Sequence, residues 1–111
     1  MKKINIGQKE LVHFVGIGGI GMSGLAQIMK NMGFRVQGSD QNKNKNTMSC
    51  SKEGIKIFIG HSKKNVRKST ILVRSSAIKN NNSEIRYAKK KKYRSIQELK
   101  CLPTLYHLKK I

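Results

Sequence analysis

Short apolar runs, separated by glycine-rich or polar stretches, divide the chain into alternating strand-like and helix-like segments. The run Leu11–Val15 ends at a glycine cluster and predicts a strand that is buried on both faces. From Met22 to Met32 apolar residues recur at helical spacing, and Gly33 follows where a helix end favours a left-handed residue. Residues 34–39 alternate, so the first part of the chain predicts a strand–helix–strand unit with a right-handed crossover.

The second half of the chain continues this pattern in shorter segments. Apolar residues at 55–59 and 70–74 predict a third and a fourth strand. Residues 82–85 combine a cap-like side chain with an acidic first helical turn, and the lysines at 89–92 lie where positive charge favours a helix end. Residues 93–102 are ambiguous. The whole pattern predicts an α/β fold with a Rossmann-like, mostly parallel sheet in a single small domain.

Length and composition limit what the chain can be. Its 111 residues leave room for one domain, and the low aromatic content of 5%, without Trp, predicts a small aliphatic core. No apolar run approaches the roughly 20 residues that cross a bilayer, so we expect a cytoplasmic protein without a membrane partner. Cys50 and Cys101 match no metal-ligand or redox spacing, and we assign them no function.

The formal net charge of +19 has two interpretations. A basic face is typical of nucleic-acid-binding proteins, because each phosphate contact releases counterions. Lysine and asparagine are, however, frequent throughout the sequence, and no nucleic-acid-binding motif accompanies them. We therefore favour a compositional bias and expect nucleic acid to bind only non-specifically.

A glycine-rich turn follows the first predicted strand. Gly16, Gly18 and Gly21 satisfy the pattern GxGxxG, and Asp40 stands 19 positions after the last of them. The first glycine allows a tight turn, the second lets the backbone approach a diphosphate, and the third lets helix and strand pack closely. Because the turn joins a predicted strand to a predicted helix, it indicates nucleotide binding. The alternative is a turn that serves only the packing of strand and helix.

The segment from His13 to Ala26, HFVGIGGIGMSGLA, resembles the N-terminal signature of the Mur ligase family of peptidoglycan synthesis. Within that family it is similar to the ligases that join L-alanine to UDP-N-acetylmuramate. The sister enzymes that recycle murein tripeptide have a Cys-Gly-Thr-type turn where this chain has Gly18-Gly19-Ile20. Further motifs resemble the family in the same order along the chain: Gly38-Ser39-Asp40, Gly60-His61, Asn65-Val66, Ser75-Ser76-Ala77-Ile78, Asn82, Glu84-Ile85 and Ala88.

The resemblance implies an enzyme of three domains. The first would hold UDP-N-acetylmuramate, the second would bind ATP with Mg²⁺ on a P-loop, and the third would help to place L-alanine. ATP would phosphorylate the muramoyl carboxylate, and the amine of alanine would attack the acyl phosphate. This sequence contains no GxxxxGK[ST] pattern.

From the same resemblance we expect residues 1–102 to form the UDP-sugar-binding domain and residues 103–111 to lead into a missing ATP-binding domain. Asn/Lys enrichment and the irregular segment 94–102 depart from the family pattern. We therefore expect either a truncated copy or a split copy that is inactive alone, and in the split case a separate chain would carry the ATP-binding and C-terminal domains.

The predicted substrate-binding residues lie on the glycine turn and after the second, third and fourth strands: Gly16, Gly18, Gly19, Ile20, Gly21, Ser39, Asp40, His61, Ser75 and Ser76. Backbone groups of the turn are expected to cradle the pyrophosphate, while Ser39 and Asp40 are expected at the uridine end. Asp40 as a strand-end turn former and His61 as an idle loop residue are the alternatives. His13 is expected in the core, and no catalytic residue or metal site is predicted.

Two other functions share some of these features. A regulatory NAD-binding module would have the same glycine turn and strand-end acid, but Ser39 next to Asp40 and the later His-Ser-Ser pattern favour the ligase. A basic nucleic-acid-binding protein is supported by the charge alone.

Overall fold

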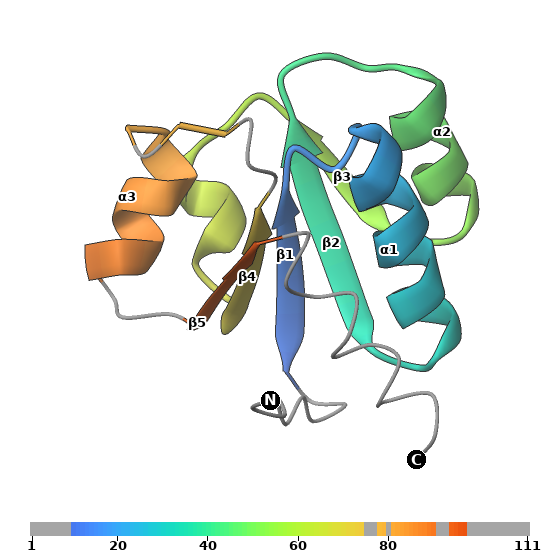
Figure 1. Cartoon of the computed structure of the whole chain (residues 1–111), viewed down its shortest axis with the longest axis horizontal. Helices are drawn as coiled ribbons and strands as arrows, with labels where there is room; N and C mark the ends of the chain where they lie inside the picture. Colours follow the sequence, from blue (N-terminus) through green and yellow to red (C-terminus); the bar gives the residue numbers. More distant parts are fainter. Residues whose placement is uncertain (1–9, 75–77, 80, 91–93, 98–111) are drawn as a thin grey trace.

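A five-stranded sheet forms the centre of the computed structural model, which describes residues 10–74, 78–79, 81–90 and 94–97. The strand order is β3-β2-β1-β4-β5, and all four neighbouring pairs are parallel. Figure 1 shows the strands side by side: β1 (Leu11–Val15), β2 (Arg35–Asp40), β3 (Lys56–Ile59), β4 (Ile71–Arg74) and β5 (Arg94–Gln97). This order is that of a doubly wound sheet, which confirms the predicted Rossmann-like fold.

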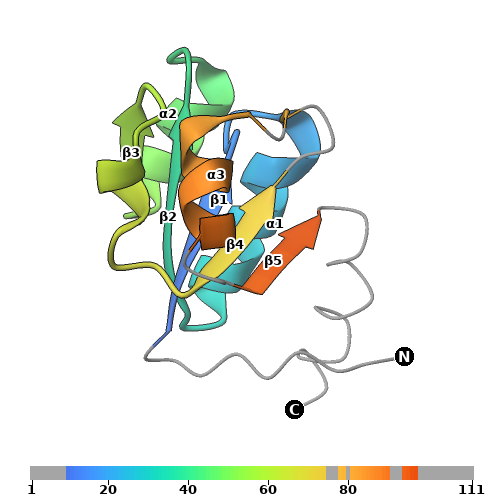
Figure 2. The same ribbon diagram turned by 90° about the vertical axis from the view of Figure 1, so that its left-hand side faces the viewer.

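Helices cover both faces of the sheet. Helices α1 (Ile20–Asn31) and α2 (Lys45–Lys52) lie on one face, while the 3₁₀ helix η1 (Lys63–Val66) and helix α3 (Ser83–Lys90) lie on the other. The view turned by 90° shows α3 in front of the sheet and α1 behind it (Figure 2). In the part of the chain that the structure describes, no helix is long and apolar enough to cross a membrane.

Alternation along the strands builds two separate cores. Val12 and Phe14 of β1 join the larger cluster under α1 and α2, whereas Val15 joins a smaller cluster under η1 and α3. His13 points to the same face as Val15 and is 0% exposed, so its predicted buried position is confirmed. Its neighbours on that face are polar as well as apolar, because Ser39 and Glu84 are buried there beside Val15.

The structure extends the sequence-based expectation at the start of α1 and in the segment 93–102. Helix α1 begins at Ile20 rather than Met22, because Gly19 adopts an extended backbone and caps the helix inside the glycine turn. Gly33 has the expected left-handed backbone, with φ of 95°. The ambiguous segment contains β5, whose sequence carries a single apolar residue and whose pairing with β4 is a long-range contact.

A close approach between β2 and the glycine turn requires glycine at position 38. A Cβ atom on Gly38 would lie 2.5 Å from Cδ1 of Ile17 and 2.9 Å from the carbonyl oxygen of Phe14. Ile17 is itself fully buried, and its N–H donates to the carbonyl of Ser39 at 2.9 Å. This hydrogen bond holds Ile17 in place, so a methyl group added at position 38 would overlap with Ile17 and with the backbone of Phe14.

We expect Gly38→Ala to lower the free energy of unfolding by about 1–3 kcal/mol through overpacking. Gly24→Ala is the matched control, because Gly24 lies within α1 and a Cβ atom there would have nothing within 4 Å. Alanine at this helical position should raise the free energy of unfolding by about 0.5–1 kcal/mol. Urea denaturation followed by circular dichroism measures both, and effects of the same sign would contradict this packing argument.

Candidate functional site

A cavity of about 380 Å³ opens at the carboxyl edge of the sheet, next to the glycine turn. It lies beside the end of β1, where the strand order reverses, with β2 and β3 on one side of β1 and β4 and β5 on the other. Ligands of open α/β sheets bind at this switch point. The lining residues come from the turn, the ends of β2 and β3, and the segment before α3: Gly16, Asp40, Gln41, His61, Ile78, Lys79, Asn81 and Asn82.

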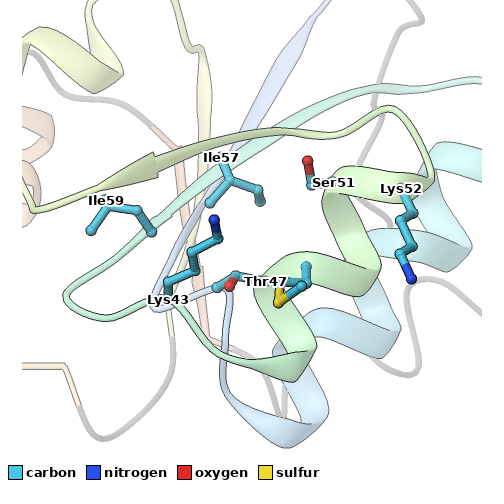
Figure 3. Close-up of a pocket in the computed structure, with 7 residues that line it drawn as sticks. Lys43, Thr47, Ser51, Lys52, Ile57 and Ile59 are labelled. Carbon is cyan, nitrogen blue, oxygen red and sulfur yellow. The ribbon is translucent and has the colours of Figure 1, made fainter.

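A second hollow lies between α2 and the edge strand β3 (Figure 3). Its volume is also about 380 Å³, and lysines rim a partly apolar floor: Lys43, Thr47, Met48, Ser51, Lys52, Ile57 and Ile59. None of the predicted site residues that the structure describes lines it. The cavity at the carboxyl edge is therefore the stronger candidate for a ligand site.

The glycine turn is closed by backbone hydrogen bonds. The N–H groups of Gly16 and Ile17 both donate to the carbonyl of Ser39, at 2.8 and 2.9 Å. Gly16 has a φ of 82°, a conformation that favours glycine, and its carbonyl accepts from Gly19 at 3.1 Å. These bonds anchor the turn to the end of β2, as expected for the first glycine of the pattern.

The first turn of α1 offers unused hydrogen-bond donors. Within the described residues, no acceptor contacts the N–H groups of Ile20, Gly21 or Met22. Gly19, Ile20 and Gly21 are exposed, with Ile20 at 92%, and the first turn contains no acidic side chain. A helix N-terminus of this kind attracts anions through its free N–H groups and its dipole.

The side chain of Asp40 bonds to the part of the glycine turn where the sequence predicts the ligand. Its Oδ2 atom accepts the N–H of Gly18 at 2.8 Å, and its Oδ1 atom accepts the N–H of Asn42 at 3.2 Å. A Cβ atom on Gly18 would lie 2.7 Å from Oδ2 of Asp40. Glycine at position 18 thus makes room for Asp40, and the Gly18 N–H is already bonded. Asp40 is a strand-end turn former and a cavity residue at once.

Ser39 lies beneath the cavity and not in it. Its side chain is on the α3 face of β2 and is 0% exposed, so its contact with the uridine end stays a prediction that the lining of the cavity does not support. The alternation of β2 explains the difference, because Asp40 and Ser39 must point to opposite faces. Of the other predicted residues, His61 lines the cavity, whereas Ser75 and Ser76 lie outside the described residues.

The carboxylate of Glu84 is the centre of a buried polar network. Glu84 is 0% exposed and belongs to the first turn of α3. Its Oε1 atom accepts from Ser39 Oγ at 2.6 Å and His13 Nε2 at 2.8 Å. Its Oε2 atom accepts from the N–H of Ser62 at 3.1 Å and from Asn65 Nδ2 at 2.8 Å. Four donors therefore satisfy one buried carboxylate.

These contacts keep Glu84 ionised. Burial by itself would raise the pKa of Glu84, but the hydrogen bond from His13, the charge of His13 when protonated, and the bonds from Ser39 and Asn65 lower that pKa from 4.5 to about 2. From the sequence, Glu84 is predicted as an acid in a first helical turn and as part of a family-like motif, without a role in the site. The polar residues His13 and Ser39, on one face of two buried strands, are the sequence signal of its burial.

His61 connects this network to the cavity. Its Nδ1 atom is 3.0 Å from Ser39 Oγ and 3.5 Å from Glu84 Oε2, while the residue also lines the cavity. In the described part of the chain, no group of three or more His, Cys, Asp or Glu side chains is arranged to hold a metal ion.

The comparisons with known proteins agree on one family. The sequence pattern of the "Mur ligase family, catalytic domain" matches residues 11–109. UDP-N-acetylmuramate–L-alanine ligase of Pelagibacter ubique is 63% identical over 89 residues, which are 80% of this chain and 19% of that protein. The corresponding ligase of Rickettsia typhi is 48% identical over 98 residues, 88% of this chain and 20% of that protein.

Solved structures show the same similarity. The UDP-N-acetylmuramate–alanine ligase of Thermotoga maritima superimposes with a TM-score of 0.76 at 35% identity, over 79% of this chain and 20% of that one. A ligase of Neisseria meningitides that acts on L-alanyl-γ-D-glutamyl-meso-diaminopimelate gives 0.74 at 25% identity, over 80% and 28%. This chain thus spans about a fifth of the length of the curated relatives it matches.

We expect Glu84 to make the protein acid-sensitive. Since its pKa is lower in the folded state (about 2) than in the unfolded state (4.5), its contribution is present above pH 4.5 and is lost as the pH falls toward 2. That contribution is on the order of 3 kcal/mol. Urea denaturation between pH 2 and 7 should show a flatter profile for Glu84→Gln. Glu53→Gln, at an exposed acid after α2, should keep the parental slope.

Proposed function

Since the chain belongs to the Mur ligase family, we propose that it binds UDP-N-acetylmuramate in the carboxyl-edge cavity and serves as the substrate-binding domain of an L-alanine ligase. The observation that carries this proposal is the coincidence of two features at one place. A cavity at the switch point of the sheet is lined by Gly16, and the turn that begins at Gly16 leads into the free N–H groups at the N-terminus of α1.

The diphosphate is the part of the ligand that the turn would hold. The N–H groups of Ile20, Gly21 and Met22 are available as donors, and an anion at such a helix end gains about 0.3–2 kcal/mol from the dipole. Lys79 lines the cavity and supplies a positive charge for a phosphate oxygen. Asp40 and His61 would then face the nucleoside or sugar groups that carry hydroxyls and N–H donors.

The ligation itself needs parts that this sequence does not contain. In the proposal, ATP and Mg²⁺ bind to domains outside this sequence, since no GxxxxGK[ST] pattern occurs in it. Whether those domains follow in the same polypeptide or come from a separate chain, residues 1–102 are proposed as the UDP-sugar-binding unit. The similarity to ligases favours this function over an NAD-binding module and over a basic nucleic-acid-binding protein.

A charge placed on the turn tests the diphosphate position. Ile20→Glu should weaken UDP-N-acetylmuramate binding by about tenfold in calorimetry, because a carboxylate competes with the diphosphate for the helix N-terminus. An acid in the first turn also stabilises a helix, so a loss of affinity cannot come from unfolding. Ile20→Gln is the uncharged control and should bind like the parent. Equal affinities for both variants would place the diphosphate elsewhere.

We also expect this chain alone to form no amide from ATP, L-alanine and UDP-N-acetylmuramate. Positioning of reactants is worth about 7–11 kcal/mol in such reactions, and a domain that holds one substrate cannot supply it. Exposed lysines are not preorganised around the transferred phosphoryl group and do not replace a P-loop. A phosphate-release assay with chromatography of the alanine adduct measures this. Turnover above the enzyme-free control would contradict the proposal.

A further inference from the structure

We propose that Glu84 holds the proton of His61 on Nδ1, so that Nε2 of His61 faces the cavity as a hydrogen-bond acceptor for a hydroxyl or N–H group of the ligand. This inference rests on the proposed function, because it assigns a part of the same ligand to a named atom. Glu84 is a positioning residue in this scheme, since it acts through His61 and does not touch the ligand.

The first step is the protonation state of His13. Nε2 of Gln37 lies 2.6 Å from the carbonyl oxygen of Asn65, and a carbonyl oxygen can only accept. The same amide nitrogen is 2.9 Å from Nδ1 of His13, so Nδ1 accepts its second hydrogen. His13 is therefore neutral with its proton on Nε2, which donates to Glu84 at 2.8 Å.

The second step is the direction of the hydroxyl of Ser39. An ionised carboxylate accepts and never donates, and Oε1 of Glu84 is the nearest acceptor, at 2.6 Å. The single hydroxyl proton of Ser39 therefore goes to Glu84. The oxygen of Ser39 is left with lone pairs, and one of them faces His61 Nδ1 at 3.0 Å. Two acceptors cannot face each other at that distance, so Nδ1 of His61 carries the proton.

The third step concerns the opposite nitrogen of His61. No described residue bonds to its Nε2 atom, and this atom is not among the buried groups that lack a partner. It therefore retains access to solvent on the cavity side of the ring. In the neutral ring, with the proton held on Nδ1, Nε2 is an acceptor.

This assignment gives the proposed site two parts, the N-terminus of α1 beyond the glycine turn and the cavity that His61 lines. The N-terminus of α1 provides only donors, which suit the oxygens of a diphosphate. His61 provides an acceptor, which suits a ribose hydroxyl, a sugar hydroxyl or an amide N–H and repels a phosphate oxygen. Sites built to bond a hydroxyl or N–H group discriminate against ligands that lack it, because the site's polar atom is then left unpaired.

Long-range ¹H–¹⁵N spectra of the imidazole rings in the ligand-free protein at pH 7 test the tautomers directly. We expect His13 with its proton on Nε2 and His61 with its proton on Nδ1. In Glu84→Gln, His61 should show a mixture of tautomers, whereas Glu53→Gln should leave both spectra unchanged. A proton on Nε2 of His61 in the parent protein would overturn the inference. Because this result comes from the parent protein alone, it does not depend on the folding of any variant.

Two substitutions of His61 test the ligand side. The amide nitrogen of His61→Asn replaces the Nδ1 donor but leaves no atom at the position of Nε2, whereas the oxygen of His61→Gln reaches toward that position. By calorimetry, His61→Asn should bind UDP-N-acetylmuramate about tenfold more weakly and inorganic pyrophosphate equally well. His61→Gln should recover part of the affinity.

The outcomes separate this inference from the proposed function. Equal losses of UDP-N-acetylmuramate and pyrophosphate in His61→Asn would show that His61 contacts the diphosphate and would overturn the acceptor role. Failure of the parent protein to bind UDP-N-acetylmuramate, with the expected tautomers in the spectra, would overturn the proposed function and leave the proton assignment standing.

Discussion

One buried carboxylate connects most of the parts from which the candidate site is built. Glu84 enters from α3 and is bonded to β1 through His13 and to β2 through Ser39. It is also bonded to the segment that follows β3, through Ser62 and Asn65. A buried charge is costly unless all of its hydrogen bonds are made, so these elements are stable only in one mutual arrangement. The carboxyl edge of the sheet is therefore set by a polar contact and not by apolar packing alone.

A second carboxylate shapes the glycine turn. Asp40 bonds the N–H of Gly18 and stands beside the helix end that we propose for the diphosphate. A negative charge at this place works against an anionic ligand, yet it keeps the turn in the conformation that exposes the later N–H groups. The contact between Asp40 and Gly18 thus makes the turn rigid but lowers its affinity for an anionic ligand. A side chain at position 18 would meet the carboxylate of Asp40, so it would disturb the turn even without a ligand.

Local patterns predicted the first half of the fold well. The strand at Leu11–Val15, the glycine turn and helix α1 follow from periodicity and turn chemistry within about twenty residues. The contacts of Glu84 could not be predicted in this way, because His13 lies 71 positions away in sequence. Strand β5 was missed for a similar reason, since its pairing with β4 compensates for a polar sequence. The orientation of Ser39 could have been predicted from the sequence. Val36 is an apolar residue of the same strand that faces the core under α1, and strand alternation then places Ser39 on the opposite face.

The edge strand β3 gives the high positive charge a physical role of its own. An edge strand presents unpaired backbone groups to which a strand of another molecule can add. Next to this edge the apolar side chains of Ile59 and Met48 are exposed and favour such an association. Lys56 lies over the ring of Phe58 on the same strand, and Lys43 and Lys52 rim the adjoining hollow. Two copies that approach through β3 must bring these lysines together. Electrostatic repulsion between the lysines thus opposes self-association through β3. Salt screens the lysines and weakens this repulsion.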